Sequence, residues 1–175
     1  MKRSAINPIP PFFDRYINLA PDEDIITALE HYPTIETLVD RPALEQLGDR
    51  IYAEGKWQVK DILQHIIDNE RIQAYRALRF SRKDASLLPG YNEQLFSSNA
   101  NAINRGLDEL LAEFAVVRRS TIFLFRSFTE EMQHHTGTCF NVSISVAALG
   151  FVIVGHQLHH CNIIKERYLP LLKFA

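Results

Sequence analysis

Residues 146–168 read VAALGFVIVGHQLHHCNIIKERY and contain the most informative helical pattern of the chain. Alternating steps of three and four residues, the spacing of one helical face, connect Val146, Leu149, Ile153, His156, His160, Ile163 and Arg167. This face is apolar at its start and carries imidazoles in its middle. The pattern predicts a helix over residues 143–168 that ends at Pro170 and turns His156 and His160 toward the protein interior.

Three earlier segments show the same periodicity of apolar residues, namely residues 22–39, 58–80 and 99–128. Pro33 lies within the first segment and should kink or break it, because proline removes a backbone donor and clashes with the preceding turn. Trp57, just before the second segment, suggests an aromatic anchor for the helix start. Gln58 is a poor cap for that helix, since Ser, Thr, Asp or Asn is preferred there.

Long connections separate these predicted helices, over residues 41–55, 81–98 and 130–142, and the first of them has room for one helical turn. None of them shows the alternation of a convincing strand. Four amphipathic helices without strands predict an all-α fold, a four-helix bundle. Because the connections are long enough to cross the bundle, a simple up-down-up-down order is not required.

The first residues of the chain, MKRSAINPIPPFF, differ from the rest in their proline content. Pro8, Pro10 and Pro11 favour extended backbone, whereas Phe13 and Tyr16 could dock a short turn on the body. We therefore divide the chain into an N-terminal arm, residues 1–20, and a bundle domain, residues 21–175.

The composition narrows the classes of partner. A formal net charge of −2 over 175 residues argues against a general basic field for nucleic acid. The most apolar run, residues 146–154, is shorter than the roughly 20 residues that a bilayer requires, so we expect no membrane partner. Cys139 and Cys161 form no CxxC motif, which indicates free thiols in a reducing compartment and a cytoplasmic protein.

Two histidines one helical turn apart can bind one metal ion or can be ordinary buried residues, and spacing leaves both readings open for His156 and His160. A catalytic zinc site uses three protein ligands and an open position. His65, among aliphatic residues of the second predicted helix, is the best candidate for a third ligand from another helix. The pattern fits equally well with a His65 side chain that lies at the edge of the helix and points to solvent.

Other polar residues near these histidines are candidates for substrate contacts. Asp68 and Asn69 lie one turn beyond His65, and Asn92 and Glu93 lie in the long loop that follows. His159 flanks the inner face of the last helix. The absence of a HExxH arrangement disfavours protease chemistry.

Four segments in this order resemble the DinB family: GKWQVKDILQHIIDNERIQAYRALRF, LPGYNEQLF, LDELLAEFAVVRRST and VSISVAALGFVIVGHQLHHCNIIKERYL. They span roughly residues 20–170. Two positions depart from the family pattern. Gln58 stands where Ser or Thr usually follows the tryptophan, and Asn92 stands where the loop often has Asp after Gly and an aromatic residue.

The resemblance implies a four-helix bundle in up-down-down-up order that is often a homodimer. It also implies a divalent metal held by three histidines, which correspond to His65, His156 and His160; we expect zinc or nickel. Some family members resemble S-transferases that use a low-molecular-weight thiol, and others are described as metal-dependent hydrolases or stress-induced proteins.

Two functions follow as hypotheses. In the first, the metal activates a thiol or water nucleophile toward a small-molecule substrate, as in an S-transferase or hydrolase. In the second, the protein is a non-catalytic dimeric bundle with a structural metal or none, acting as a stress-related interaction module.

Overall fold

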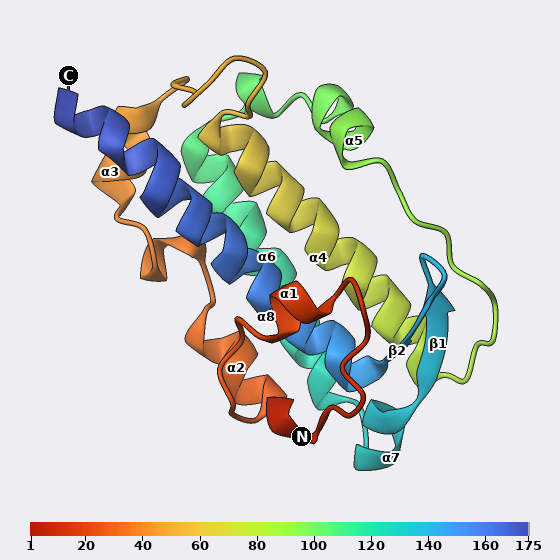
Figure 1. Cartoon of the computed structure of the whole chain (residues 1–175). Coiled ribbons are helices and arrows are strands. Elements are labelled where there is room, and N and C mark those ends of the chain that lie inside the picture. The colour runs from red at the N-terminus through yellow and green to blue at the C-terminus, as the bar shows by residue number, and fades with distance from the viewer. Residues whose placement is uncertain (175) are drawn as a thin grey trace.

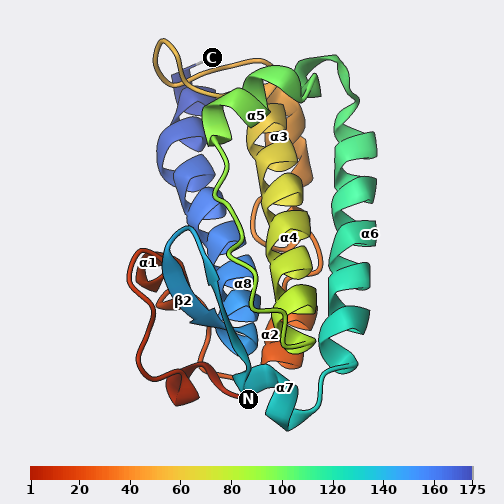
Figure 2. The same ribbon diagram turned by 90° about the vertical axis from the view of Figure 1, so that its right-hand side faces the viewer.

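The computed structural model describes residues 1–174 and is a helical bundle (Figure 1). Its three long helices are α4 (Val59–Ser81), α6 (Leu107–Arg126) and α8 (Val146–Ile163). Two short helices, α2 (Ile25–His31) and α3 (Arg41–Leu47), occupy the fourth position. The all-α four-helix bundle is thus confirmed. Figure 2 shows α4 and α6 running in one direction and α8 running in the opposite one.

The first helix differs from the prediction of a helical stripe over residues 22–39. The carboxylate of Asp24 caps α2 by accepting a hydrogen bond from the Ile26 N–H at 2.9 Å, so the helix begins at Ile25. The helix ends at His31, two residues before Pro33, and a 3-10 turn over Ile35–Thr37 precedes α3. Proline therefore breaks the helix, as expected, and α3 fills part of a segment predicted as a connection.

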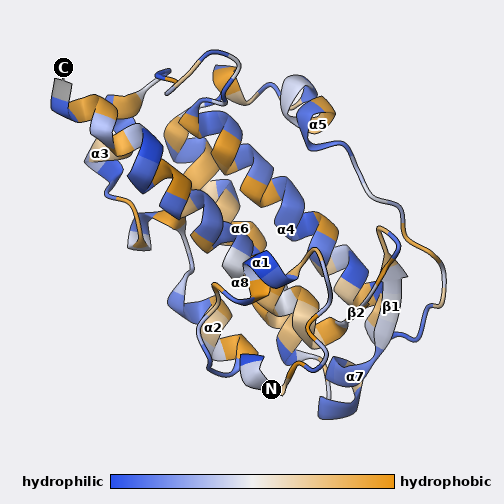
Figure 3. Cartoon of the chain, viewed as in Figure 1, coloured by the Kyte–Doolittle hydropathy of each residue, from blue (hydrophilic) through white to orange (hydrophobic). Residues whose placement is uncertain are grey.

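Helix α4 follows the prediction closely. The Asp61 carboxylate accepts a hydrogen bond from the Gln58 N–H at 3.0 Å, which satisfies one backbone donor at the start of the helix. Figure 3 shows both hydrophilic and hydrophobic residues along α4, as expected for a helix with one buried face.

The connections contain more regular structure than the sequence pattern indicated. Helix α5 (Glu93–Asn99) lies in the loop after α4, and α6 begins only at Leu107, not at residue 99. After α6 come α7 (Glu130–His134) and a hairpin of β1 (Thr136–Cys139) and β2 (Val142–Ser145). The expectation of a strand-free chain was wrong.

The hairpin is joined by Phe140 and Asn141, whose φ angles are both positive, at 51° and 59°. Antiparallel pairing of Cys139 with Val142 makes this a two-residue turn, and positive φ at both central positions is the type I′ geometry. Asn adopts a positive φ readily, whereas Phe rarely does, so Phe140 has a backbone conformation that is unusual for its residue type.

Helix α8 begins at Val146, where Ser145 Oγ accepts a hydrogen bond from the Ala148 N–H at 3.2 Å. Residues 143–145, predicted as helix, belong to β2. Pro170 does not end the coil as predicted: a π-helical turn over Ile164–Tyr168 leads into 3-10 turns over Leu169–Phe174. Pro170 sits near the start of those turns, where its missing N–H leaves no bond unmade.

The N-terminal segment packs into the core. Its one-turn helix α1 (Asp14–Ile17) lies against α8, and Phe13, Tyr16 and Ile17 are buried. Gly155 permits this approach, because a Cβ there would lie 1.8 Å from the Tyr16 carbonyl oxygen. Whether residues 1–20 form a separable arm stays a prediction.

Two apolar clusters fill the interior. One joins the N-terminal segment, α2 and the first half of α8, and the other joins α3, the start of α4, α6 and the far end of α8. Helices α4 and α8 also carry buried polar residues, which are candidates for a functional site. None of the helices within residues 1–174 has both the length and the apolar character needed to cross a bilayer.

Candidate metal centre and adjoining cavity

Helices α4 and α8 pack side by side and bring three predicted site residues together. His65, from α4, and His156 and His160, from α8, are all buried, with exposed fractions of 5%, 2% and 8%. His65 Nε2 lies 3.0 Å from His156 Nε2, and His160 Nε2 lies 3.2 Å from the same atom. The three candidate ligand atoms all lie within 4.8 Å of one another.

These distances fit a shared metal ion. Tetrahedral coordination with metal–nitrogen bonds of about 2.0–2.1 Å spaces the ligand nitrogens roughly 3.3 Å apart. The two short separations, 3.0 and 3.2 Å, are close to that spacing. The residues present therefore suit a divalent cation with small adjustments of the rings.

Hydrogen bonding among the rings is a less complete alternative. A neutral imidazole carries one N–H donor and one acceptor nitrogen. His156 Nε2 faces two other ring nitrogens and can make a full hydrogen bond with one of them, so the other is left poorly satisfied. A cation at the shared point accepts all three lone pairs, which makes it the better partner for this arrangement.

Burial keeps these rings neutral. It lowers the pKa of His65 to about 4, with a further contribution from His159. Burial also lowers the pKa of His156 and of His160 well below the usual range, and the neighbouring imidazoles add to the effect. Neutral imidazoles expose the lone pairs that a metal ion requires.

Two aromatic residues flank the three histidines. The Trp57 ring centroid lies 4.8 Å from that of His65, and its indole N–H donates to Gln94 Oε1 at 3.3 Å. The Tyr16 ring centroid lies 5.1 Å from that of His156. Sequence reasoning named Trp57 only as a helix anchor and Tyr16 only as a docking residue. Their signal, an aromatic residue before a histidine-bearing helix and another in a proline-rich segment, was too general to indicate a site.

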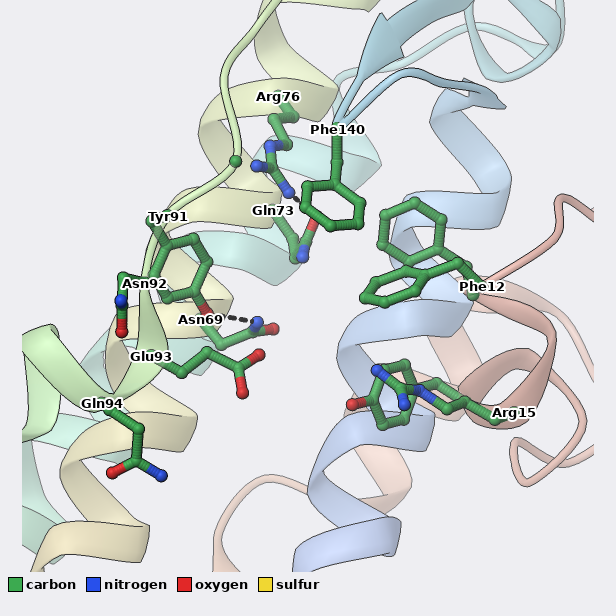
Figure 4. Close-up of a pocket in the computed structure, with 13 residues that line it drawn as sticks. Phe12, Arg15, Asn69, Gln73, Arg76, Tyr91, Asn92, Glu93, Gln94 and Phe140 are labelled. Atoms are coloured by element: carbon green, nitrogen blue, oxygen red, sulfur yellow. Dashed lines mark hydrogen bonds between the residues drawn. The ribbon is translucent and has the colours of Figure 1, made fainter.

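A cavity of about 350 Å³ lies beside this centre, between α4, the N-terminal segment, the loop before α5 and the hairpin turn (Figure 4). Tyr16 lines the cavity and also contacts His156, so the cavity adjoins the histidines. A second cavity of about 190 Å³ is lined by His160 and Trp57. Gln94 lines both.

Three of the predicted substrate-binding residues, Asn69, Asn92 and Glu93, line the larger cavity. The Glu93 carboxylate is directed into it (Figure 4). Asn92 also has a structural role, because its Oδ1 accepts a hydrogen bond from the Leu95 N–H at 3.0 Å and caps α5. Sequence reasoning missed Arg76 and Tyr91, which line the same cavity from α4 and from the loop.

The two remaining candidates lie elsewhere. Asp68 accepts a hydrogen bond from Gln64 Nε2 at 2.9 Å, and burial raises the pKa of its carboxyl group. The His159 ring is half-buried, with its centroid 5.1 Å from that of His160 and 5.5 Å from that of Tyr16. Neither is among the residues that line the two cavities; His159 contacts the centre through His160, whereas Asp68 interacts with Gln64 and Arg71 on its own helix.

A model of the DinB superfamily matches residues 29–164, which include all three histidines. A search of curated proteins finds no match.

Among solved structures, YfiT from Bacillus subtilis is similar, with a TM-score of 0.66 and 19% sequence identity over 84% of this chain and 85% of that one. That protein is described as "a probable metal-dependent hydrolase with an unusual four-helix bundle topology". At this identity the likeness shows the fold.

Proposed function

The chain belongs to the DinB superfamily, and from that membership and its converging histidines we propose that it is a metal-dependent enzyme acting on a small molecule. His65, His156 and His160 would hold one divalent ion, with zinc or nickel as the expected metal. The observation that carries the proposal is the convergence of three buried ring nitrogens within 4.8 Å of one another.

A metal bound there would lower the pKa of a water or thiol and so supply a nucleophile at neutral pH. The chain's own residues have separate tasks. Burial keeps the three imidazoles unprotonated, and Trp57 and Tyr16 restrict water and hold the rings in place. Glu93 has the only carboxylate among the residues that line the larger cavity, so we assign it the removal of a proton from the bound nucleophile or substrate.

Hydrolysis and thiol S-transfer both fit this scheme. The description of YfiT supports the hydrolase. Transfer from a low-molecular-weight thiol is supported only by the thiol-using members of the family to which the chain belongs. A cavity of about 350 Å³ suits a small-molecule ligand in either case. We expect the enzyme to be a cytoplasmic homodimer.

The metal is tested first. Untagged protein should contain about one divalent ion per chain by elemental analysis, and His156→Ala should remove it while the helical circular dichroism is kept. His31→Ala is the matched control, since the His31 ring is exposed on α2 and bonded to Glu23. Full retention of metal in His156→Ala would contradict the assignment.

Catalysis is tested by stripping the metal. The enzyme hypothesis expects a protein that stays folded and loses hydrolysis or thiol transfer with an activated electrophile. A metal-free protein that loses most of its melting temperature, and a metal-loaded one that turns over neither class of substrate, would favour the structural bundle.

A further inference from the structure

We propose that the larger cavity recognises an oxyanion, a carboxylate or phosphate carried on an apolar body, through Arg76. The inference deepens the proposed function by naming its substrate class, and the reaction at the metal still depends on that proposed function. Anion binding itself does not, which allows the two to be tested separately.

Arg76 is a buried cation without an anion. Its exposed fraction is 4%, and it lines the cavity from the second half of α4. Nη1 donates to Gln73 Oε1 at 3.2 Å and Nη2 donates to the Pro89 carbonyl at 2.9 Å. Both acceptors are neutral, and within residues 1–174 no carboxylate lies within ion-pair distance of this guanidinium. A buried charge is costly unless it is paired, so an anion supplied by a ligand completes the site.

Arg76 also keeps unused hydrogen-bonding capacity. A guanidinium has five N–H donors in a planar fork that matches carboxylate and phosphate oxygens. Only two of these bonds are made within the described chain. The remaining donors suit a ligand oxyanion in a charge-assisted bond.

Asn69 provides a second, independent sign of a ligand. Its Nδ2 donates to Tyr91 Oη at 2.8 Å, while its Oδ1 is buried without a partner. Reversing the amide would leave Nδ2 unpaired instead. In either orientation one amide atom faces the cavity without a partner, as expected where a ligand makes the missing hydrogen bond.

The arrangement on α4 connects this cavity to the metal centre. His65, Asn69, Gln73 and Arg76 follow one another at spacings of four, four and three, which places them on one helical face. Eleven residues separate the ends of this row, about 16 Å along the axis. Helical side chains tilt toward the N-terminus, so the guanidinium reaches back toward the histidines. A ligand with its anion at one end and its reacting atom at the other spans this row.

Aromatic residues provide the apolar part of the cavity. Phe12, Phe140 and Tyr91 line it (Figure 4), and the ring centroids of Phe12 and Phe140 are 4.8 Å apart. Arg15, near the opening, stacks over Phe12 with its guanidinium carbon 4.5 Å from the ring centroid. Two arginines against the single Glu93 carboxylate favour an anionic ligand.

Calorimetric titration of the full chain with three probes tests the proposal: 3-phenylpropionate, 2-phenylethylphosphonate and the neutral 3-phenylpropanamide. We expect at least one anion to bind tenfold or more tightly than the amide, and the tighter anion identifies the oxyanion class. Arg76→Gln should abolish that preference, and Arg76→Lys should reduce it because the fork is lost while the charge remains. Arg71→Gln is the matched control: it removes a charge from an exposed site of α4 that is paired with Glu113.

The same titration on metal-stripped wild-type protein separates this inference from the proposed function. A preference for the anion that survives stripping supports Arg76, even if no catalysis is found. A preference lost from stripped protein that keeps its helical circular dichroism means that the anion binds the metal and overturns the proposal; if stripping unfolds the chain, the Arg76→Gln titration on metal-loaded protein decides. It is overturned as well if wild-type protein does not discriminate between anion and amide, or if folded Arg76→Gln discriminates as wild-type protein does.

Discussion

Helix α4 contributes to two buried polar clusters that differ in how they are satisfied. Glu70 and Arg118 of α6 are each 1% exposed in their side chains and form a two-fold hydrogen-bonded ion pair, at 2.9 Å between Nε and Oε1 and 2.8 Å between Nη2 and Oε2. Arg118 also donates to the carbonyl of Tyr32, just past the end of α2. The opposite charges cancel, and the protein supplies every partner.

The histidine cluster has no such internal balance. Its three rings direct basic nitrogens toward one another, burial lowers the pKa of each, and no carboxylate is bonded to them within residues 1–174. The difference shows that burial of polar groups alone does not mark a functional site. A cluster complete in itself contributes to the fold, whereas a cluster that needs an external partner indicates binding.

The largest expected effect comes from breaking the complete cluster. Arg118→Met leaves the Glu70 carboxylate buried and unpaired, which should lower the free energy of unfolding by about 3–5 kcal/mol. Removing both charges in Glu70→Leu/Arg118→Met should recover most of that loss, because no uncompensated charge remains. Urea unfolding followed by circular dichroism measures both. A loss below about 1 kcal/mol in the single variant would show that the pair is not buried as described.

The incomplete cluster should respond to pH in metal-free protein. The pKa of His65 falls from 6.5 to about 4 on folding, so the unfolded chain binds the extra proton between these values. Stability therefore rises with pH through this window: it is full above pH 6.5 and is lost as the pH falls toward 4. From pH 7.5 to pH 5 the loss from His65 alone is about 2 kcal/mol.

Urea unfolding at the two pH values tests this, with His65→Leu as the comparison. The variant should lose about 2 kcal/mol less than wild-type protein over the same range, because the titrating group is gone. An equal pH dependence in the two proteins would mean that His65 is not buried in its neutral form. The double variant Glu70→Leu/Arg118→Met should keep the wild-type dependence, since it leaves the three histidines in place and no unpaired buried carboxylate.

The parts of the molecule that the sequence predicted are the ones encoded by local spacing. Helices α4 and α8, and the inward direction of His156 and His160, follow from apolar residues at helical intervals. The strands of the hairpin are four residues long, with one buried residue in each, so alternation gives almost no signal. Its position depends on a distant contact: a Cβ at Gly137 would lie 2.1 Å from the Phe80 ring.

The rest of the candidate site could not be predicted either, because it also depends on contacts between residues that are distant in the sequence. Arg76 reads in the sequence as one more charged residue of an amphipathic helix, and nothing local shows that the loop carrying Pro89 and Tyr91 covers it. The pairing of Glu70 with Arg118 joins residues 48 positions apart. Such contacts arise from the packing of helices, and a single sequence does not record them.

The smallest expected effect comes from moving the N-terminal segment that packs on the histidine cluster, which leaves the Glu70–Arg118 pair undisturbed. Gly155→Ala places a methyl group where the Tyr16 carbonyl oxygen now lies, 1.8 Å from the new Cβ. We expect a loss of about 1–2 kcal/mol in unfolding free energy, toward the lower end of overpacking because α1 is a single turn that can shift outward.

Moving Tyr16 from His156 should also weaken metal binding, measured by competition with a chelator. Gly106→Ala, where a Cβ meets nothing within 4 Å, is the control: as the N-cap of α6 it should cost no more than about 1 kcal/mol and should leave metal binding unchanged. Because alanine is intrinsically better than glycine in a helix by roughly 1 kcal/mol, a Gly155→Ala protein more stable than wild type would show that the N-terminal segment does not dock on α8, and the histidine cluster would then be open on that side.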